Sequence, residues 1–81
     1  NITVNFNNVP NVGGFIYTAQ VIIRQINGTG TISGVQVNGQ TATTYYASSP
    51  SVGTGWDVIK YFFYVSGTSW RAYGNSVGYT E

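Results

Sequence analysis

The hydrophobic residues of this chain alternate along extended segments, and the longest segment, residues 56–65, is hydrophobic on both faces. A β-strand directs successive side chains to opposite faces of a sheet. One face of this segment carries Trp56, Val58, Lys60, Phe62 and Tyr64, and the other carries Asp57, Ile59, Tyr61, Phe63 and Val65. Two hydrophobic faces need two covers, because an antiparallel strand in a small domain usually has one face in water. We therefore expect one face to pack in the chain's own sheet and the other against a neighbouring copy, with Tyr61, Phe62, Phe63 and Tyr64 as contact residues.

Shorter alternating segments predict the other strands. The predicted strands are residues 2–6, 15–26, 31–37, 40–46, 56–65, 69–73 and 76–80. A helix over residues 15–26 is rejected, because its apolar residues would lie all round and it would contain a run of β-branched residues. Ser33-Gly34 interrupts the third strand and indicates a bulge there.

Glycine pairs and short polar runs predict the turns between these strands. Asn38-Gly39 is the clearest hairpin signal, because a type I′ turn needs two residues with positive φ. Asn27-Gly28 predicts another turn, and residues 66–68 predict a third. Gly74 is expected to break the last strand in two.

The residue types agree with an all-β fold. The chain has no Leu, and its apolar residues are the β-branched and aromatic types that suit strands, together with Ala. We expect a small antiparallel β-sandwich or meander of about six or seven strands. No repeat or interior linker divides the 81 residues, so residues 1–81 form a single domain. Since the chain contains no Met, we expect it to be a processed product or a piece of a longer protein.

The low charge content and the missing residue types limit how so small a domain can be stabilised. Only 6% of residues are charged, the net charge is +1, and Cys and His are absent. Disulfides and the usual soft metal ligands are therefore excluded, which leaves oligomerisation as the expected means of stabilisation. No basic patch predicts nucleic-acid binding, and no apolar run is long enough to predict membrane insertion.

The residues needed for catalysis are scarce. General acid–base chemistry uses His or paired carboxylates, and this chain has one internal Asp and one terminal Glu. We therefore expect no enzymatic activity, no cofactor and no metal site. If three or more copies met at an axis, Asp57 from each copy would offer a cation site. A strand-start carboxylate bonded to loop amides is the interpretation we favour for Asp57.

Three aromatic residues are candidates for contact with a receptor. Tyr45 and Tyr46 stand where a strand enters the longest loop, and Trp56 stands where that loop ends. If the loop folds back, the three rings cluster at one tip, where they would contact a host-surface glycan or simply plug the end of the fold. Neighbouring residues of a strand point to opposite faces, so at most one of Tyr45 and Tyr46 faces the core. With so few charges, binding there is expected to depend little on salt.

The order and spacing of several short motifs resemble a known family. They are Val9-Pro10, the strand at 17–23 followed by Gln25, the hairpin at 35–39, the Pro50 loop, Asp57-Val58, the turn at 67–70, Gly74 and Tyr79. Together they resemble the β-rich domain found in tail-fibre and other virion structural proteins of bacteriophages, particularly of marine and cyanobacterial hosts. Members often carry a Trp and paired Gly before the Pro loop, where this chain has residues 45–49. The family's receptor specificity is therefore not carried over.

The resemblance implies a non-enzymatic virion component, a homotrimer that contacts other virion proteins and lies at the particle surface. Two alternatives remain at this point. A monomeric carbohydrate-binding module would display an aromatic platform. A subunit of an extracellular filament would exchange its N-terminal strand, residues 2–6, with its neighbour. Oligomeric state separates the three, since they are a closed trimer, a monomer and an open polymer.

Overall fold

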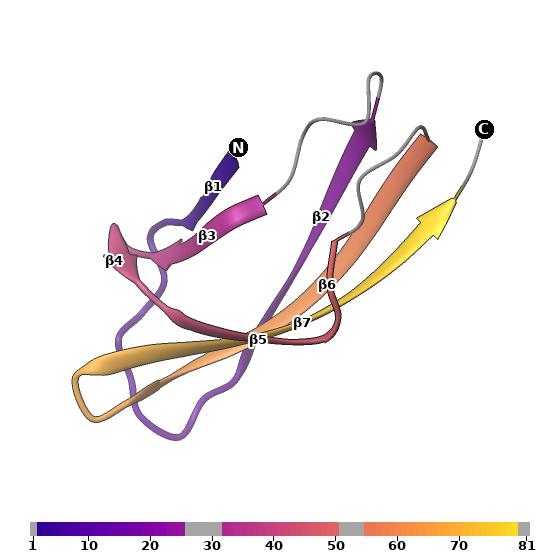
Figure 1. Cartoon of the computed structure of the whole chain (residues 1–81). Coiled ribbons are helices and arrows are strands. Elements are labelled where there is room, and N and C mark those ends of the chain that lie inside the picture. The colour runs from indigo at the N-terminus through magenta and orange to yellow at the C-terminus, as the bar shows by residue number, and fades with distance from the viewer. Residues whose placement is uncertain (1, 26–31, 51–54, 80–81) are drawn as a thin grey trace.

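The described residues form seven strands in two sheets (Figure 1). A computed structural model of the chain describes residues 2–25, 32–50 and 55–79. The strands are β1 (Ile2–Phe6), β2 (Tyr17–Gln25), β3 (Ile32–Val37), β4 (Gln40–Thr41), β5 (Thr43–Ser48), β6 (Gly55–Ser66) and β7 (Ser69–Tyr79). The described residues contain no helix, so the predicted all-β class is confirmed.

The two sheets are mixed in strand direction. One sheet has the order β1-β3-β4 and the other has the order β2-β6-β7-β5. Strands β1 and β3 are parallel, as are β5 and β7, and the remaining three pairs are antiparallel. The parallel pairs differ from the antiparallel arrangement expected, because β1 and β5 each join a sheet beside a strand that does not follow them in sequence.

The segment predicted as one strand over residues 40–46 serves both sheets. Only Gln40 and Thr41 pair with β3 in the predicted hairpin. The next residue, Ala42, is buried, and its N–H donates to Val35 O at 2.9 Å. From there the chain continues as β5, the edge strand of the four-stranded sheet. A small side chain fits this corner because it lies inside the core.

Two tight turns and one bulge lie where the sequence predicts them. Asn38 and Gly39 have φ of 52° and 77°, as a type I′ turn requires. Gly67 has a φ of 65° at the start of the turn between β6 and β7. The partner of Thr3 on β3 is Gly34, whereas Ile2 pairs with Ile32, so Ser33 is the extra residue of a bulge. The turn expected at 27–28 lies outside the described residues.

The break expected at Gly74 is absent, and β7 continues through it to Tyr79. A Cβ on Gly74 would lie 2.7 Å from Tyr46 Cε1 and 2.8 Å from Tyr61 Cε1. Glycine is needed here because two aromatic rings approach the backbone of an unbroken strand.

The core lies between the two sheets and is rich in aromatic rings. Phe6 of the small sheet stacks on Phe63 with ring centroids 4.9 Å apart, and it meets Tyr61 edge-on at 5.8 Å. Trp70 is buried and meets Phe63 edge-on. Residues Ile59, Tyr61 and Phe63 of β6 therefore fill the chain's own core. The expectation that Tyr61 and Phe63 contact a neighbour is wrong, whereas Phe62 and Tyr64 lie on the opposite face.

Candidate functional site

The outward side of the four-stranded sheet, here called the open face, carries the candidate site. It consists of the even-numbered residues 18–24 of β2 and 56–64 of β6, the odd-numbered residues 71–79 of β7, and Thr43 and Tyr45 of β5. Alternation sends these side chains away from the core. Several large apolar residues on this face stay exposed, including Ile22 (56%), Phe62 (45%) and Tyr79 (58%).

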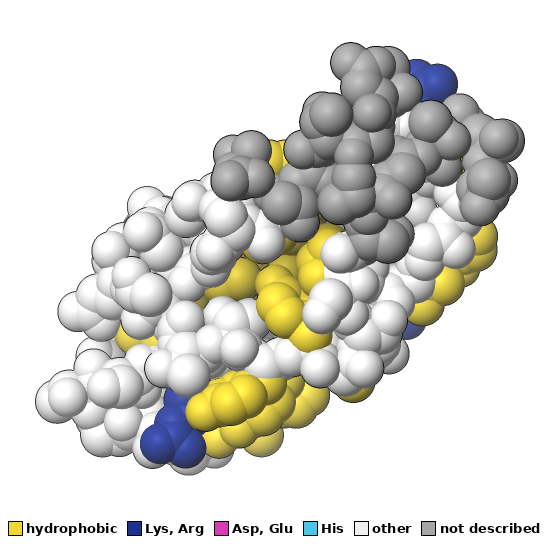
Figure 2. All heavy atoms as spheres, in the orientation of Figure 1, with side chains coloured by type: hydrophobic (Ala, Val, Ile, Leu, Met, Phe, Trp, Pro, Cys, Tyr) yellow, Lys and Arg dark blue, Asp and Glu magenta, His cyan; other side chains and the backbone are white. Residues whose placement is uncertain are grey.

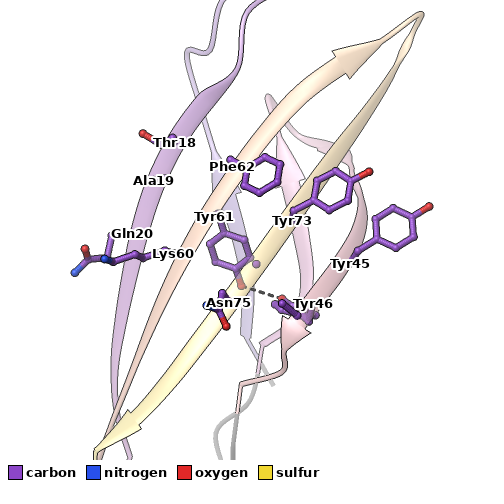
Figure 3. Close-up of a pocket in the computed structure, with 12 residues that line it drawn as sticks. Thr18, Ala19, Gln20, Tyr45, Tyr46, Lys60, Tyr61, Phe62, Tyr73 and Asn75 are labelled. Carbon is purple, nitrogen blue, oxygen red and sulfur yellow. Dashed lines mark hydrogen bonds between the residues drawn. The ribbon is translucent and has the colours of Figure 1, made fainter.

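A row of stacked rings crosses the open face from β6 to β5. Strand pairing places Phe62 beside Tyr73 and Tyr73 beside Tyr45. The centroids of Phe62 and Tyr73 are 4.9 Å apart at 11° between planes, and those of Tyr73 and Tyr45 are 5.2 Å apart at 22° (Figure 3). Near-parallel rings at this spacing are offset-stacked, so each covers part of its neighbour's face. We call these three residues the aromatic row.

Tyr64 extends the aromatic row along β6. Its ring lies 6.1 Å from that of Tyr73 at 12° between planes, and the two hydroxyl oxygens are 3.4 Å apart. The hydrogen bond with Tyr64 raises the pKa of Tyr73 above its usual value. The Tyr73 hydroxyl therefore stays protonated at neutral pH and remains able to donate as well as accept.

A polar row separates the aromatic row from a second apolar region. Gln20, Lys60 and Asn75 lie side by side on β2, β6 and β7. Beyond them, the pairing brings Ile22, Val58 and Val77 together, and the next residues across the strands are Arg24, Trp56 and Tyr79. We call Ile22, Val58 and Val77 the aliphatic patch.

A groove of about 850 Å³ lies over the aromatic row and the polar row. Its walls include Thr18, Gln20, Lys60, Tyr45 and Asn75, whose arrangement across the strands is seen in Figure 3. The lining combines flat apolar rings with hydroxyl, amide and ammonium groups. Figure 2 shows hydrophobic side chains along the lower margin of the molecule, directly beside a Lys or Arg side chain.

Two tyrosines from different strands form the floor of the groove on the core side. Tyr46 and Tyr61 meet edge-on, and their hydroxyl oxygens are 2.8 Å apart (Figure 3). Burial, and then the hydrogen bond with Tyr46, raise the pKa of Tyr61 well above its usual range. The pair ties β5 to β6 across β7, because Gly74 leaves room for both rings. It fixes the position of the edge strand that carries Tyr45.

The three rings expected to cluster at one tip do not cluster. Tyr45 is 49% exposed and belongs to the aromatic row, whereas Tyr46 faces the core, which confirms that the two point in opposite directions. Trp56 pairs with Tyr79, six residues along β7 from the Tyr73 that stacks on Tyr45. At about 3.3 Å per residue the two sites are about 20 Å apart. Trp56 instead lies under the Arg24 guanidinium, 5.6 Å from its ring centroid.

Asp57 faces the core and is 2% exposed. Its Oδ2 accepts a hydrogen bond of 3.2 Å from Gln25 Nε2, and Gln25 is also buried. Because the Asp57 carboxylate points into the chain's own core, it cannot meet the Asp57 carboxylates of other copies at a symmetry axis, and the cation site considered there is ruled out. The favoured interpretation expected amide partners for Asp57, and the one described is the side-chain amide of Gln25 on β2.

The sequence suggested Tyr45 and Tyr73 as strand-end aromatics that could meet a ligand, but it did not indicate that they lie in one site with Lys60 and Phe62. Alternation alone places Phe62 with Lys60 on one face of β6 and Tyr73 with Asn75 on one face of β7. What joins these faces is the strand order and the register, and the sequence indicates neither for strands that are distant along the chain.

No protein-family model, curated protein or solved structure matches this chain. Among residues 2–25, 32–50 and 55–79, no helix is long and apolar enough to cross a membrane. The same residues contain no group of three or more His, Cys, Asp or Glu side chains placed to hold a metal ion.

Proposed function

We propose that this chain is a non-enzymatic structural domain of a bacteriophage particle surface, which self-associates and attaches the particle to its host through the open face. The observation that carries the proposal is the aromatic row with its groove, exposed on one side of the sheet. Monomeric proteins rarely expose large contiguous apolar surfaces, and such surfaces usually contact a partner. The sequence resemblance to virion domains supplies the setting.

The chemistry of the groove supports recognition over catalysis. Rings, amides and hydroxyls surround it, together with the Lys60 ammonium. Asp57, the only carboxylate among the described residues, lies on the core side of the sheet. A nucleophile such as a serine hydroxyl needs an adjacent base, and the described residues that line this groove include neither a carboxylate nor an imidazole.

The two halves of the open face suit different partners. The aliphatic patch has almost no hydrogen-bonding groups, so burial is the only interaction it provides, as at the core of a protein–protein interface. We assign self-association to this patch. The groove offers rings for apolar contact and polar groups for orientation, which is the usual composition of a ligand site. We assign host attachment to the groove. Phe62 and Tyr64, which the sequence placed at the oligomer interface, are thereby assigned to the attachment surface.

Adsorption to cells tests the attachment role. Fluorescently labelled protein would be incubated with a panel of marine cyanobacterial and other marine bacterial strains, and bound fluorescence measured by flow cytometry. We expect adsorption to some strains, and at least a several-fold loss for Phe62→Ala, since hot-spot aromatics often contribute more than about 1 kcal/mol.

Phe15→Ala provides the matched control. Phe15 is 59% exposed but lies before β2 and does not line the groove, so its removal should leave adsorption unchanged. Absence of adsorption to every strain, or equal adsorption by the Phe62 variant, would contradict the attachment role.

A further inference from the structure

The cations of this chain gather on the open face. Its three Lys and Arg residues, Arg24, Lys60 and Arg71, are all exposed there. Among the described residues the only carboxylate, Asp57, is buried on the other side of the sheet. Although the net charge is only +1, the charges are unevenly placed. The positive charges lie on the open face, and none of the described acidic residues faces it.

Two of these cations bracket the aromatic row. Lys60 lines the groove between Gln20 and Asn75. Arg71 pairs with Tyr64, four residues further along β6. The two positions are therefore about 13 Å apart along the strands, with Phe62 and Tyr73 between them. Positive charge at both ends of an apolar strip favours an extended ligand that carries negative charge at intervals.

The ends of the aromatic row provide open ring faces. Tyr45 is on the edge strand, so none of the described strands lies beside the side of its ring that faces away from Tyr73. On the other side, Phe62 is paired across the strands with Thr18, whose small side chain leaves the ring half exposed. A sugar ring stacks on such a face and bonds through its hydroxyls to nearby amides and hydroxyls, here those of Gln20, Asn75 and Thr18.

Other occupants fit this surface less well. A second copy placed face to face would bring Lys60 and Arg71 against their own counterparts, and like charges destabilise an interface. Single-stranded nucleic acid stacks successive bases on free aromatic faces, but the inner faces of the aromatic row cover one another. It also carries one phosphate per nucleotide, for which Lys60 in the groove and Arg71 beside the aromatic row are few cations.

We infer that the groove binds an anionic glycan, with Lys60 and Arg71 contacting its acidic groups and Phe62 and Tyr45 contacting its sugar rings. This inference rests on the attachment function proposed above and names the class of receptor. It also replaces the expectation that binding depends little on salt, because charge is concentrated at the one surface where the ligand lies.

Matched polysaccharides that differ only in charge test the inference. Binding of the purified protein would be measured by biolayer interferometry to polygalacturonate and its fully methyl-esterified form, and to dextran sulfate and dextran. We expect binding to at least one acidic member of these pairs, little to the neutral members, and a fall in affinity as sodium chloride is raised.

Charge-removing variants locate the binding site. Lys60→Gln and Arg71→Gln should each weaken binding to the acidic polysaccharide about two- to fivefold, which corresponds to exposed ion pairs. Arg24→Gln removes the same charge at the far end of the open face, where Arg24 lies over Trp56 and away from the aromatic row. It should change binding by less than either, with circular dichroism confirming that all three variants fold.

Equal binding to the charged and neutral members of each pair would overturn the anionic ligand, while Phe62-dependent adsorption to cells would still support the attachment role. Equal losses for the three variants would place binding outside the groove and overturn the site. Tighter binding to oligothymidylate than to either acidic polysaccharide would identify a nucleic-acid surface and overturn the glycan. Binding to no polysaccharide by a protein that adsorbs to cells would also overturn the inference.

Discussion

Gly74 shows how one residue decides the shape of the groove floor. The Tyr46 and Tyr61 rings lie within 2.8 Å of the position that a Cβ on residue 74 would occupy. Their hydroxyls are hydrogen-bonded and their rings pack in or against the core, so neither ring can move aside at low cost. Because Gly74 has no side chain, the Tyr46–Tyr61 hydrogen bond can link β5 to β6 across β7.

Gly74→Ala should destabilise the domain by about 1–3 kcal/mol, because an extra methyl group would overpack this contact. Urea unfolding followed by circular dichroism measures the change. Gly34→Ala is the matched control, since a Cβ there has nothing within 4 Å, and it should change stability by less than about 0.5 kcal/mol. Equal effects of the two substitutions would contradict the role assigned to Gly74.

The buried Tyr61 hydroxyl predicts a loss of stability at high pH. Its pKa is raised in the folded protein by burial and by Tyr46, whereas an unfolded tyrosine has a pKa of about 10. Above that pH the unfolded chain releases a proton that the folded chain retains, so unfolding becomes easier by at most about 1.4 kcal/mol per pH unit. Below that pH, Tyr61 makes no contribution to any change of stability with pH.

Urea unfolding at several pH values between about 8 and 11 tests this behaviour. Tyr61→Phe keeps the ring and removes the titrating group, so the part of the alkaline loss due to Tyr61 should disappear. Tyr46→Phe removes the hydrogen bond but not the burial, which is the larger cause, so most of the loss should remain. An alkaline profile that is identical for the Tyr61 variant and the unaltered protein would refute the assignment.

At the scale of elements, the hairpin at Asn38-Gly39 ties β1 and the loop that follows it to the rest of the small sheet. Asn38 Nδ2 donates to Val9 O at 2.7 Å, and Val9 N donates to Asn38 Oδ1 at 2.9 Å. The Gly39 N–H donates to Asn5 Oδ1, also at 2.9 Å. The turn that connects β3 to β4 therefore also holds β1 and the loop that follows it.

Gly39→Val should destabilise the domain by more than about 1 kcal/mol, because a β-branched residue resists the φ of 77° found there. Thermal unfolding followed by circular dichroism gives the comparison. Gly13→Val adds the same side chain at a loop residue whose φ is not positive and where a Cβ meets nothing, so it should be nearly neutral. An unaltered melting temperature for the Gly39 variant would rule out the turn's proposed importance.

Local signals in the sequence predicted the elements better than their assembly. The hairpin, the bulge at Ser33 and the burial of one face of β6 follow from turn chemistry and from alternation. Two features were missed for a common reason. Gly74 reads as a strand breaker until the rings from β5 and β6 are known to meet there, and Ala42 reads as mid-strand until the second sheet is known. Both depend on contacts between distant residues, as the groove does.

At the scale of the whole molecule, the charges and the exposed apolar residues together restrict how copies associate. Ile22 and Val77 of the aliphatic patch and the neighbouring Tyr79 are each about half exposed. Full burial of an Ile or Val side chain contributes about 1.5–3 kcal/mol, so covering the exposed half contributes roughly 1 kcal/mol for each of the two. Two-fold pairing of open faces would place Lys60 and Arg71 close to their own copies. In a cyclic arrangement, the patch of one chain meets a different surface of the next, which avoids this repulsion.

We therefore expect a closed trimer, with a mass of about three times the 8.7 kDa of one chain by light scattering at micromolar concentration. The double variant Ile22→Lys, Val77→Lys should shift the mass to that of a monomer without loss of the β-type circular dichroism spectrum, because it places charge where apolar burial is needed. Val12→Lys adds charge at an exposed loop residue, 45% accessible and outside the aliphatic patch, and should leave the trimer intact.

A monomeric unaltered protein would instead favour a free carbohydrate-binding module, and a mass that rises without limit as concentration increases would favour a filament built by exchange of β1. A dimer would show that the repulsion between open faces is overcome, and would overturn the cyclic arrangement.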